Sequence, residues 1–459
     1  PRRKRRQMRD ILLITVDSLR YDHVSAYGYE RQTTPFIDSI ASKGHLFEQA
    51  FAHAGATRAS FPSILTSTYP LMYGGYERIS DDRTLISELL NDAGYRTGGF
   101  HSNLFLSSET GYSKGFDQFY DSRRDPNLAY GLRKVVRENL DRDGTLYQLL
   151  KWAFDKTEKR AGIELGSLYT RADDLTDMAI EWLEGTKSKY PTFAWVHYMD
   201  VHHPYVPPQE HQEPFRNEPI SERHAVKLRR KMLDDSESLR ESELSDIFDL
   251  YDAEIRFTDS QVQRLVHSAD RYLDDPLIVF TSDHGEEFGE HGTYGHGRLH
   301  EECVHVPLII KNNRRKGTHA ELVGLLDIAP TLADYADCSF PQTFRGYSLK
   351  KLIEKDEANW EREYVISEYG EVGLEHYHSY RDDDWTYIKD EEGERFYDRS
   401  IDPEEKNDIL NKEMYATDSA REEIAKHKQS LKNTRTEVDR LDMDDDVLDR
   451  LEDLGYRME

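Results

Sequence analysis

Carboxylate and imidazole side chains come directly after two apolar runs of the sequence. Ile11–Val16 is followed by Asp17, and Leu277–Thr281 is followed, after one serine, by Asp283 and His284. In an open α/β sheet the carboxyl ends of the strands line the ligand crevice. Two carboxylates and one imidazole placed there can bind one divalent cation, and this donor set suits Mg, Mn, Ca or Zn without deciding among them. Asp17 alone could equally cap a helix, so the predicted metal site depends mainly on the second run.

The hydroxyl of Thr57 is a second candidate for chemistry, because it stands just before a segment expected to form a short helix. At the positive end of a helix, backbone N–H groups favour a deprotonated oxygen and bind tetrahedral anions. Metal coordination would lower the pKa of the hydroxyl further and make it a nucleophile. The alternative is that Thr57 is simply the N-cap of that helix, and the local sequence alone favours the cap.

The elements that position these residues follow from the hydrophobic pattern. Short β-branched runs alternate with amphipathic helical stretches, which predicts an α/β fold with a large, mainly parallel sheet sandwiched by helices. The expected core strands are Ile11–Thr15, Thr97–His101, Phe193–His197, Leu277–Thr281 and Val306–Ile310. The expected helices are Pro35–Lys43, Thr84–Ala93, Asp173–Leu183 and Ile247–Val266. Short antiparallel strands are expected later, at Tyr364–Glu368, Trp385–Lys389 and Glu394–Asp398.

These patterns predict a division of the chain into parts. A basic N-terminal arm covers residues 1–10, and a catalytic domain covers 11–345, with charged insertions near 121–166 and 208–243. A smaller antiparallel sheet subdomain is expected over 346–412, followed by an acidic helical tail over 413–459.

Composition narrows the possible partners and compartment. The chain has 459 residues and a formal net charge of −27, which argues against nucleic-acid binding and suits a halophilic cytoplasm. No run approaches the ~18–20 apolar residues that cross a bilayer, so we expect a cytoplasmic protein without a transmembrane segment. The basic arm could touch the anionic inner membrane surface, although a solvated tail is the simpler interpretation. Cys303 and Cys338 are too few for a disulfide framework.

Longer stretches of the sequence match one known family. The opening Leu12–Tyr29 is the first match, and the rest follow in family order. They are Thr34-Pro35, Thr57–Thr66 with Tyr69-Pro70, Leu85–Thr97, His197–Tyr205, Ser282–Gly292, His296-Gly297, Val306–Ile310, Phe396-Tyr397-Asp398 and Asp402-Pro403. Together these stretches resemble the sulfatase family of the alkaline phosphatase superfamily. The resemblance implies a large α/β domain with a smaller C-terminal sheet domain. It also implies hydrolysis or transfer of sulfate or phosphate esters at a metal-held nucleophile.

The resemblance assigns roles position by position. Asp17, Asp283 and His284 match the family's metal ligands, and Thr57 falls on the nucleophile position, where its oxygen is also a ligand. The further residues that the resemblance places at the site are His202 and His296, which would contact the anionic group or protonate the leaving group, and Arg58 and Asn103, which would bind substrate. The neighbouring histidines His203, His291, His300 and His305 are interpreted as ordinary packed or solvent-facing side chains.

Departures from the family pattern concern the nucleophile. Formylglycine sulfatases need Cys or Ser there, followed by Pro and Arg, whereas this chain has Thr57 followed by Ala59 and Phe61 at those offsets. Oxidation of threonine at Cβ would give a ketone and not the required aldehyde. Asp17 is followed by Ser18, where calcium-binding sulfatases have a second Asp, and Asn103 ends the stretch that replaces the family's Gly-Lys-x-His. These changes favour phosphodiester chemistry, or transfer of phospho-linked head groups, through an unmodified threonine.

The function predicted from the sequence is therefore a metal-dependent hydrolase or transferase. Its substrate would be an anionic sulfate or phosphate ester, such as a glycan or a lipid head group, and phosphoester chemistry is favoured. One alternative is a true sulfuric ester hydrolase of the arylsulfatase kind. Others are a non-catalytic binder of sulfated or phosphorylated glycan or lipid, or a purely structural protein.

Overall fold

The structure is a computed structural model. It describes residues 8–121, 169–185, 190–354, 360–370, 376–434 and 436. Most of the basic arm, the insertion near 121–166 apart from Asp121, and the acidic tail beyond 436 lie outside the described residues.

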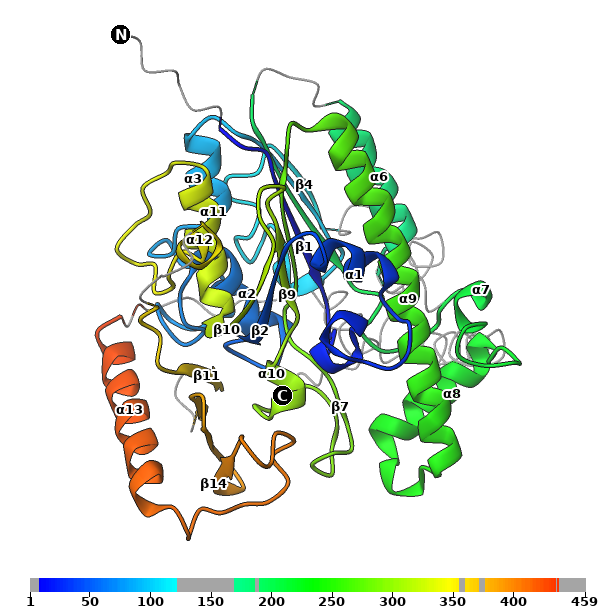
Figure 1. The fold of residues 1–459 in the computed structure, drawn as a ribbon, viewed down its shortest axis with the longest axis vertical. Helices are drawn as coiled ribbons and strands as arrows, with labels where there is room; N and C mark the ends of the chain where they lie inside the picture. The colour runs from blue at the N-terminus through cyan, green and yellow to red at the C-terminus, as the bar shows by residue number, and fades with distance from the viewer. Residues whose placement is uncertain are drawn as a thin grey trace, which may run out of the picture.

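A large sheet forms the centre of the molecule (Figure 1). Its eight strands have the order β10-β2-β9-β6-β1-β5-β3-β4. They span Ile11–Val16 (β1), His45–Phe51 (β2), Arg96–Phe100 (β3), Gln118–Tyr120 (β4), Thr192–Tyr198 (β5), Leu277–Ser282 (β6), Leu308–Lys311 (β9) and Gly317–Gly324 (β10). All neighbours pair in parallel except β9, which runs antiparallel to both β6 and β2. The predicted fold class, a mainly parallel sheet sandwiched by helices, is confirmed.

Alternate residues of each core strand point into two separate apolar layers. In β1, Ile11 and Leu13 join one hydrophobic cluster, whereas Leu12, Ile14 and Val16 join the other. This division follows from the two-residue period of a strand that is buried on both faces. The run of aliphatic residues in β1 is therefore the signature of a central strand.

Helices cover both layers (Figure 1). One face carries α2 (Thr57–Thr66), α3 (Ile86–Asp92) and α11 (Ile328–Tyr335), with α12 (Lys350–Glu354) packed on α11. The opposite face carries α1 (Pro35–Ala41), α6 (Ala172–Glu184) and α9 (Glu241–Tyr272). The predicted insertion near 208–243 folds as α7 (Gln209–Gln212) and α8 (Glu222–Asp234), which pack against α9.

The C-terminal part forms a second, antiparallel sheet. Its strands are β11 (Val365–Tyr369), β12 (Tyr377–Arg381), β13 (Trp385–Asp390) and β14 (Gly393–Asp398), and α13 (Met414–Lys432) packs against β12 and β13. Tyr387 and Phe396 meet Ile424 of α13 in a small core. Two hydrogen bonds connect β11 of this sheet with the residues that follow β2 of the large sheet. The Glu368 N–H donates to His53 O, and Ser367 Oγ donates to Ala52 O.

Sequence analysis missed β2, β4, β10 and β12, and also the short strands β7 (Glu287–Phe288) and β8 (Tyr294–Gly295). In β2 only some positions are buried, with Glu48 exposed and Gln49 half-buried, so no unbroken apolar run marks it. Two residues assigned to the basic arm, Arg9 and Asp10, are buried, and Asp10 accepts the N–H of Thr192 at 2.6 Å. Among the described residues, no helix is long and apolar enough to cross a membrane.

Candidate active site

The strand register brings the first predicted ligands together. Val16 pairs with Ser282, so Asp17 and Asp283 leave the adjacent strands β1 and β6 at the same level of the sheet. One ligand atom each from Asp17, Asp283 and His284 lies within 4.8 Å of the others, and all three side chains are fully buried. We call these three residues the carboxylate cluster.

Thr57 faces the carboxylate cluster. It is the first residue of α2, and Ala56, not Thr57, is the N-cap of the helix. Its hydroxyl donates to Asp17 Oδ2 at 3.0 Å and lies 3.1 Å from His284 Nε2, with the side chain fully buried. The capping alternative therefore does not describe this residue. The positive end of the α2 dipole adds to the attraction of the site for an anion.

The chemistry of the carboxylate cluster fits a divalent cation. Asp283 Oδ2 is buried and has no hydrogen-bond partner among the described residues. Burial raises the pKa of Asp283, and the Asp17 carboxylate raises it further. Burial alone would raise the pKa of Asp17 as well, but the neighbouring imidazoles of His197, His202 and His284 hold it well below its usual value. A cation with oxygen and imidazole ligands would relieve the repulsion between the two carboxylates.

Supporting contacts fix the orientation of the ligands. Ser18 Oγ donates to Asp17 Oδ1 at 2.8 Å, and Ser60 Oγ donates to the Asp283 carbonyl at 2.7 Å. His284 Nδ1 lies 2.8 Å from the Gly285 carbonyl, which leaves Nε2 turned toward Thr57. Such partners set the tautomer and aim of a ligating histidine. At Gly285 a Cβ atom would lie 1.9 Å from Glu302 O, so only glycine fits there.

His197 is a site residue that sequence analysis placed only in a strand. Its Nε2 lies 3.5 Å from Asp17 Oδ2, and its Nδ1 lies 3.0 Å from Thr15 Oγ1. A histidine in an apolar strand beside Asp17 was the available signal, but the sequence alone does not show that β5 pairs with β1.

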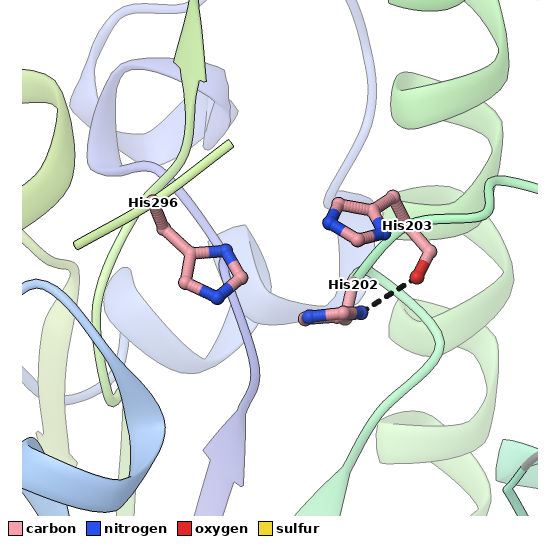
Figure 2. A group of neighbouring side chains, drawn as sticks. All are labelled: His202, His203 and His296. Atoms are coloured by element: carbon pink, nitrogen blue, oxygen red, sulfur yellow. Dashed lines mark hydrogen bonds between the residues drawn. The ribbon is translucent and has the colours of Figure 1, made fainter. Parts of the chain in front are cut away.

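Three imidazoles form a second group beside the carboxylate cluster (Figure 2). His202 and His203 follow β5, and His296 follows β8 (Tyr294–Gly295); their ring nitrogens lie within 4.8 Å of one another. The His296 ring centroid is 5.1 Å from that of His202 and 4.7 Å from that of His284. We call these three residues the imidazole cluster. His203, interpreted from the sequence as a packed or solvent-facing side chain, is buried in this cluster.

The imidazoles of this cluster differ in protonation. Burial lowers the pKa of His202 to about 4, even though the Asp17 charge acts in the opposite direction. Burial also lowers the pKa of His296, but the Glu286 carboxylate, 3.3 Å from its Nδ1, outweighs burial and raises it. The cluster therefore combines a neutral imidazole with one that favours the cationic form. Such a pair suits contact with an anion.

The two predicted substrate-binding residues lie in different surroundings. Asn103 Nδ2 is 3.5 Å from Asp17 Oδ2, so this side chain reaches the site. The Arg58 guanidinium lies over the Phe105 ring, 5.2 Å from its centroid, and 4.0 Å from Glu77 Oε1.

Comparison with known proteins agrees with the fold. A solved structure described as a complex with its substrate D-glucosamine-2-N,6-O-disulfate superposes with a TM-score of 0.71, 21% identity, and coverage of 93% of this chain and 98% of the other. The phosphonate monoester hydrolase of Agrobacterium radiobacter superposes with a TM-score of 0.69 and 20% identity, covering 93% of this chain and 95% of the other. The fold is thus that of the alkaline phosphatase-like class.

Sequence comparison gives the family. The sulfatase family model matches residues 9–338, and a model of the N-sulphoglucosamine sulphohydrolase C-terminal region matches residues 289–436. The arylsulfatase of Clostridium perfringens is 25% identical over 445 residues, covering 88% of this chain and 91% of that protein. The N-acetylglucosamine-6-O-sulfatase of Bacteroides thetaiotaomicron is 25% identical over 504 residues, covering 91% and 85%. The chain belongs to the sulfatase family, whose members generally use a divalent metal.

Proposed function

We propose that this chain hydrolyses phosphoric esters, phosphodiesters above all, with Thr57 as the nucleophile. The observation that carries the proposal is the position of the Thr57 hydroxyl, buried between Asp17 Oδ2 at 3.0 Å and His284 Nε2 at 3.1 Å. Both atoms can accept the hydroxyl proton. A hydroxyl that only capped or packed would not need two such acceptors.

Threonine at this position argues against formylglycine chemistry. The aldehyde hydrate that attacks sulfate in formylglycine enzymes forms at a carbon with no second substituent. The Cβ of Thr57 carries a methyl group, so its oxidation ends at a ketone. Thr57 therefore acts as the hydroxyl itself, through a covalent ester intermediate.

The residues that would hold the metal are Asp17, Asp283, His284 and the oxygen of Thr57, and the bound ion would lower the pKa of that hydroxyl and offset charge on the ester. Ser18 and Ser60 keep the carboxylate cluster in position through their hydrogen bonds. The start of α2 adds its dipole to the stabilisation of the equatorial oxygens.

The imidazole cluster faces the same space and serves the substrate. His296, which Glu286 holds toward its cationic form, binds an ester oxygen and can give a proton to the leaving group. His202, fixed by its Nδ1 contact of 2.6 Å with the His203 carbonyl, contacts a second oxygen (Figure 2). Asn103 adds an amide donor beside Asp17.

The reaction runs in two steps. In the first, the Thr57 hydroxyl gives its proton to Asp17 Oδ2 and its oxygen forms a bond to phosphorus, while the bond to the leaving oxygen breaks and that oxygen takes a proton from His296. In the second, water gives a proton to His296 and forms the new bond to phosphorus, while the bond to Thr57 breaks and the Thr57 oxygen takes its proton back from Asp17. An alcohol in place of water would make the same step a transfer.

A panel of esters tests the proposal. We expect kcat/KM for an aryl phosphodiester to exceed that for the matching aryl sulfate by roughly 10²-fold or more. Acid quenching during turnover should trap a phosphorylated peptide that contains Thr57, detected by mass spectrometry. A clear preference for the aryl sulfate, or a covalent adduct on another residue, would overturn the proposal.

Sulfate ester hydrolysis is the second candidate. The relatives from Clostridium and Bacteroides are named as sulfatases, which favours it, whereas the phosphonate monoester hydrolase shares the fold and favours the first candidate. A sulfated Thr57 peptide in the quenched reaction would establish it. Glycan and lipid esters in the same panel would then give the substrate class.

A further inference from the structure

A third group of potential ligands lies further along the segment that carries Asp283 and His284. His291 is in the loop between β7 (Glu287–Phe288) and β8, His300 directly precedes α10 (Glu301–Val304), and Glu302 is in α10. One ligand atom from each lies within 4.8 Å of the others. The two imidazole rings are stacked, with centroids 3.8 Å apart and an interplanar angle of 14°.

The ligand atoms of this group are buried without hydrogen-bond partners. Among the described residues, His291 Nε2, His300 Nδ1 and Glu302 Oε1 are all shielded from solvent and make no hydrogen bond, although His291 Nε2 and Glu302 Oε1 lie 3.4 Å apart as an ion pair when the imidazole is protonated. Buried polar atoms are almost always paired, because an unpaired one loses the interactions it had with water. A cation is a partner that all three atoms could share.

The donor set and spacing fit a transition-metal ion. Two imidazoles and one carboxylate are ligands that Zn²⁺ binds well. With bonds of ~2.0–2.1 Å, two ligands on a tetrahedral ion lie about 3.3 Å apart. His291 Nε2 and Glu302 Oε1 are already 3.4 Å apart. His300 Nδ1 or Nε2 lies within 4.8 Å of both.

The surroundings of this group carry charges of both signs. Glu287 lies beside Glu302, and among the described residues its Oε1 is another buried atom without a hydrogen-bond partner. Arg298 acts on Glu287, and three arginines act on His300, so the acids are partly offset. The buried ligand atoms and their spacing, and not the net charge, point to an ion.

We propose that His291, His300 and Glu302 bind a divalent transition-metal ion, Zn²⁺ in the first instance, at a site separate from the carboxylate and imidazole clusters. The ion would tie the β7–β8 loop to α10. The same hairpin delivers His296 to the imidazole cluster, so the site would fix the position of that residue without touching the substrate. The proposal does not depend on which ester the chain hydrolyses.

The test measures metal content and not ester turnover. The full chain is stripped with a chelator, equilibrated with Zn²⁺ alone and dialysed, and zinc per chain is measured by mass spectrometry of the elements. The variants are His300→Ala and Glu302→Gln for this site, Asp283→Asn for the carboxylate cluster and His202→Ala for the imidazole cluster. His267→Ala, which changes an exposed histidine whose ring lies edge-on to Phe36, is the matched control.

We expect His300→Ala and Glu302→Gln each to lose one zinc equivalent that Asp283→Asn, His202→Ala and His267→Ala retain. Zn²⁺ should raise the melting temperature of Asp283→Asn, and this shift should vanish in Asp283→Asn/Glu302→Gln. Glu302→Gln is isosteric, so it keeps the test decisive if His300→Ala fails to fold. Unchanged zinc content in Glu302→Gln, or loss of the same equivalent in His202→Ala, would overturn the proposal.

Discussion

The carboxylate cluster and the group formed by His291, His300 and Glu302 are built in opposite ways. The first is assembled from distant parts of the chain, because β1, α2 and β6 meet only in the folded sheet. The second comes from one hairpin and the short helix after it. Both contain buried ligand atoms without hydrogen bonds. Within the described part of the chain, a hydroxyl is directed at the first cluster, whereas the Thr293 hydroxyl of the hairpin donates to Glu287.

This difference predicts a catalytic role for the carboxylate cluster and a structural role for the group on the hairpin. A catalytic site needs an activated nucleophile and an anion-stabilising helix end, and the sheet supplies both at its strand ends. A local cluster on a hairpin can hold an ion, but it offers no place where a reacting atom would meet a nucleophile. Changes in the two clusters should therefore affect different measurements.

The largest effect is expected for Thr57→Ala. Loss of the nucleophile oxygen should lower kcat by roughly 10³-fold or more, because no other group holds that position. Steady-state kinetics on the preferred ester measure it. Thr66→Ala is the matched control, since Thr66 is a buried threonine in the same helix whose hydroxyl donates to Pro62 O. Near-normal turnover in Thr57→Ala with an intact fold would disprove the assignment.

A smaller contrast is expected between two isosteric changes. Asp283→Asn removes a charge from the carboxylate cluster and should lower both activity and metal affinity by about 10²-fold or more. Glu302→Gln should lower activity by less than about 10-fold, because its effect reaches His296 only through the hairpin. Steady-state kinetics and metal titrations of both variants, measured side by side, test this contrast. Equal losses of activity would mean that the two clusters form one functional unit.

Much of this arrangement could be predicted from the sequence, and the missing parts have a physical reason. Asp17, Asp283 and His284 were predicted because a polar side chain at the end of an apolar run signals a strand end. Thr57 was uncertain locally, since a threonine before a helix is usually a cap. His203, His291 and His300 were interpreted as packed or solvent-facing side chains. Their neighbours in the folded chain depend on turns and strand pairings that the hydrophobic periodicity does not encode. Their assigned roles remain predictions.

Glu286→Gln should have a moderate effect that depends on pH. The Glu286 carboxylate raises the pKa of His296, so its removal lowers that pKa and His296 loses its proton at a lower pH. The alkaline limb of the kcat profile should then move to lower pH, with a loss of about 10-fold on that limb. Glu287→Gln is the control, because its carboxylate accepts from Thr293 and should leave the profile unchanged. An unmoved alkaline limb in Glu286→Gln would remove His296 from the acid role.

The smallest effect is expected at a buried acid–imidazole pair that needs no ion. Both oxygens of Glu368 have partners, His427 Nε2 at 2.7 Å and Leu71 N at 2.7 Å, in contrast to Glu302. Burial raises the pKa of Glu368, but His427 outweighs burial and lowers it below its usual value. The pair therefore stabilises the fold above the usual glutamate pKa, and this contribution is lost as the pH falls through the lowered one.

Glu368→Gln should accordingly reduce the free energy of unfolding by about 1–3 kcal/mol near neutral pH, and by less in acid. Denaturant titrations at several pH values from about 3 to about 7, which span the range in which a carboxylate titrates, measure this difference in the free energy of unfolding. The zinc content of this variant should equal that of the unaltered chain. If the zinc content of Glu368→Gln fell instead, Glu368 would be a metal ligand although both of its oxygens have hydrogen-bond partners. Missing hydrogen-bond partners would then no longer indicate an ion site.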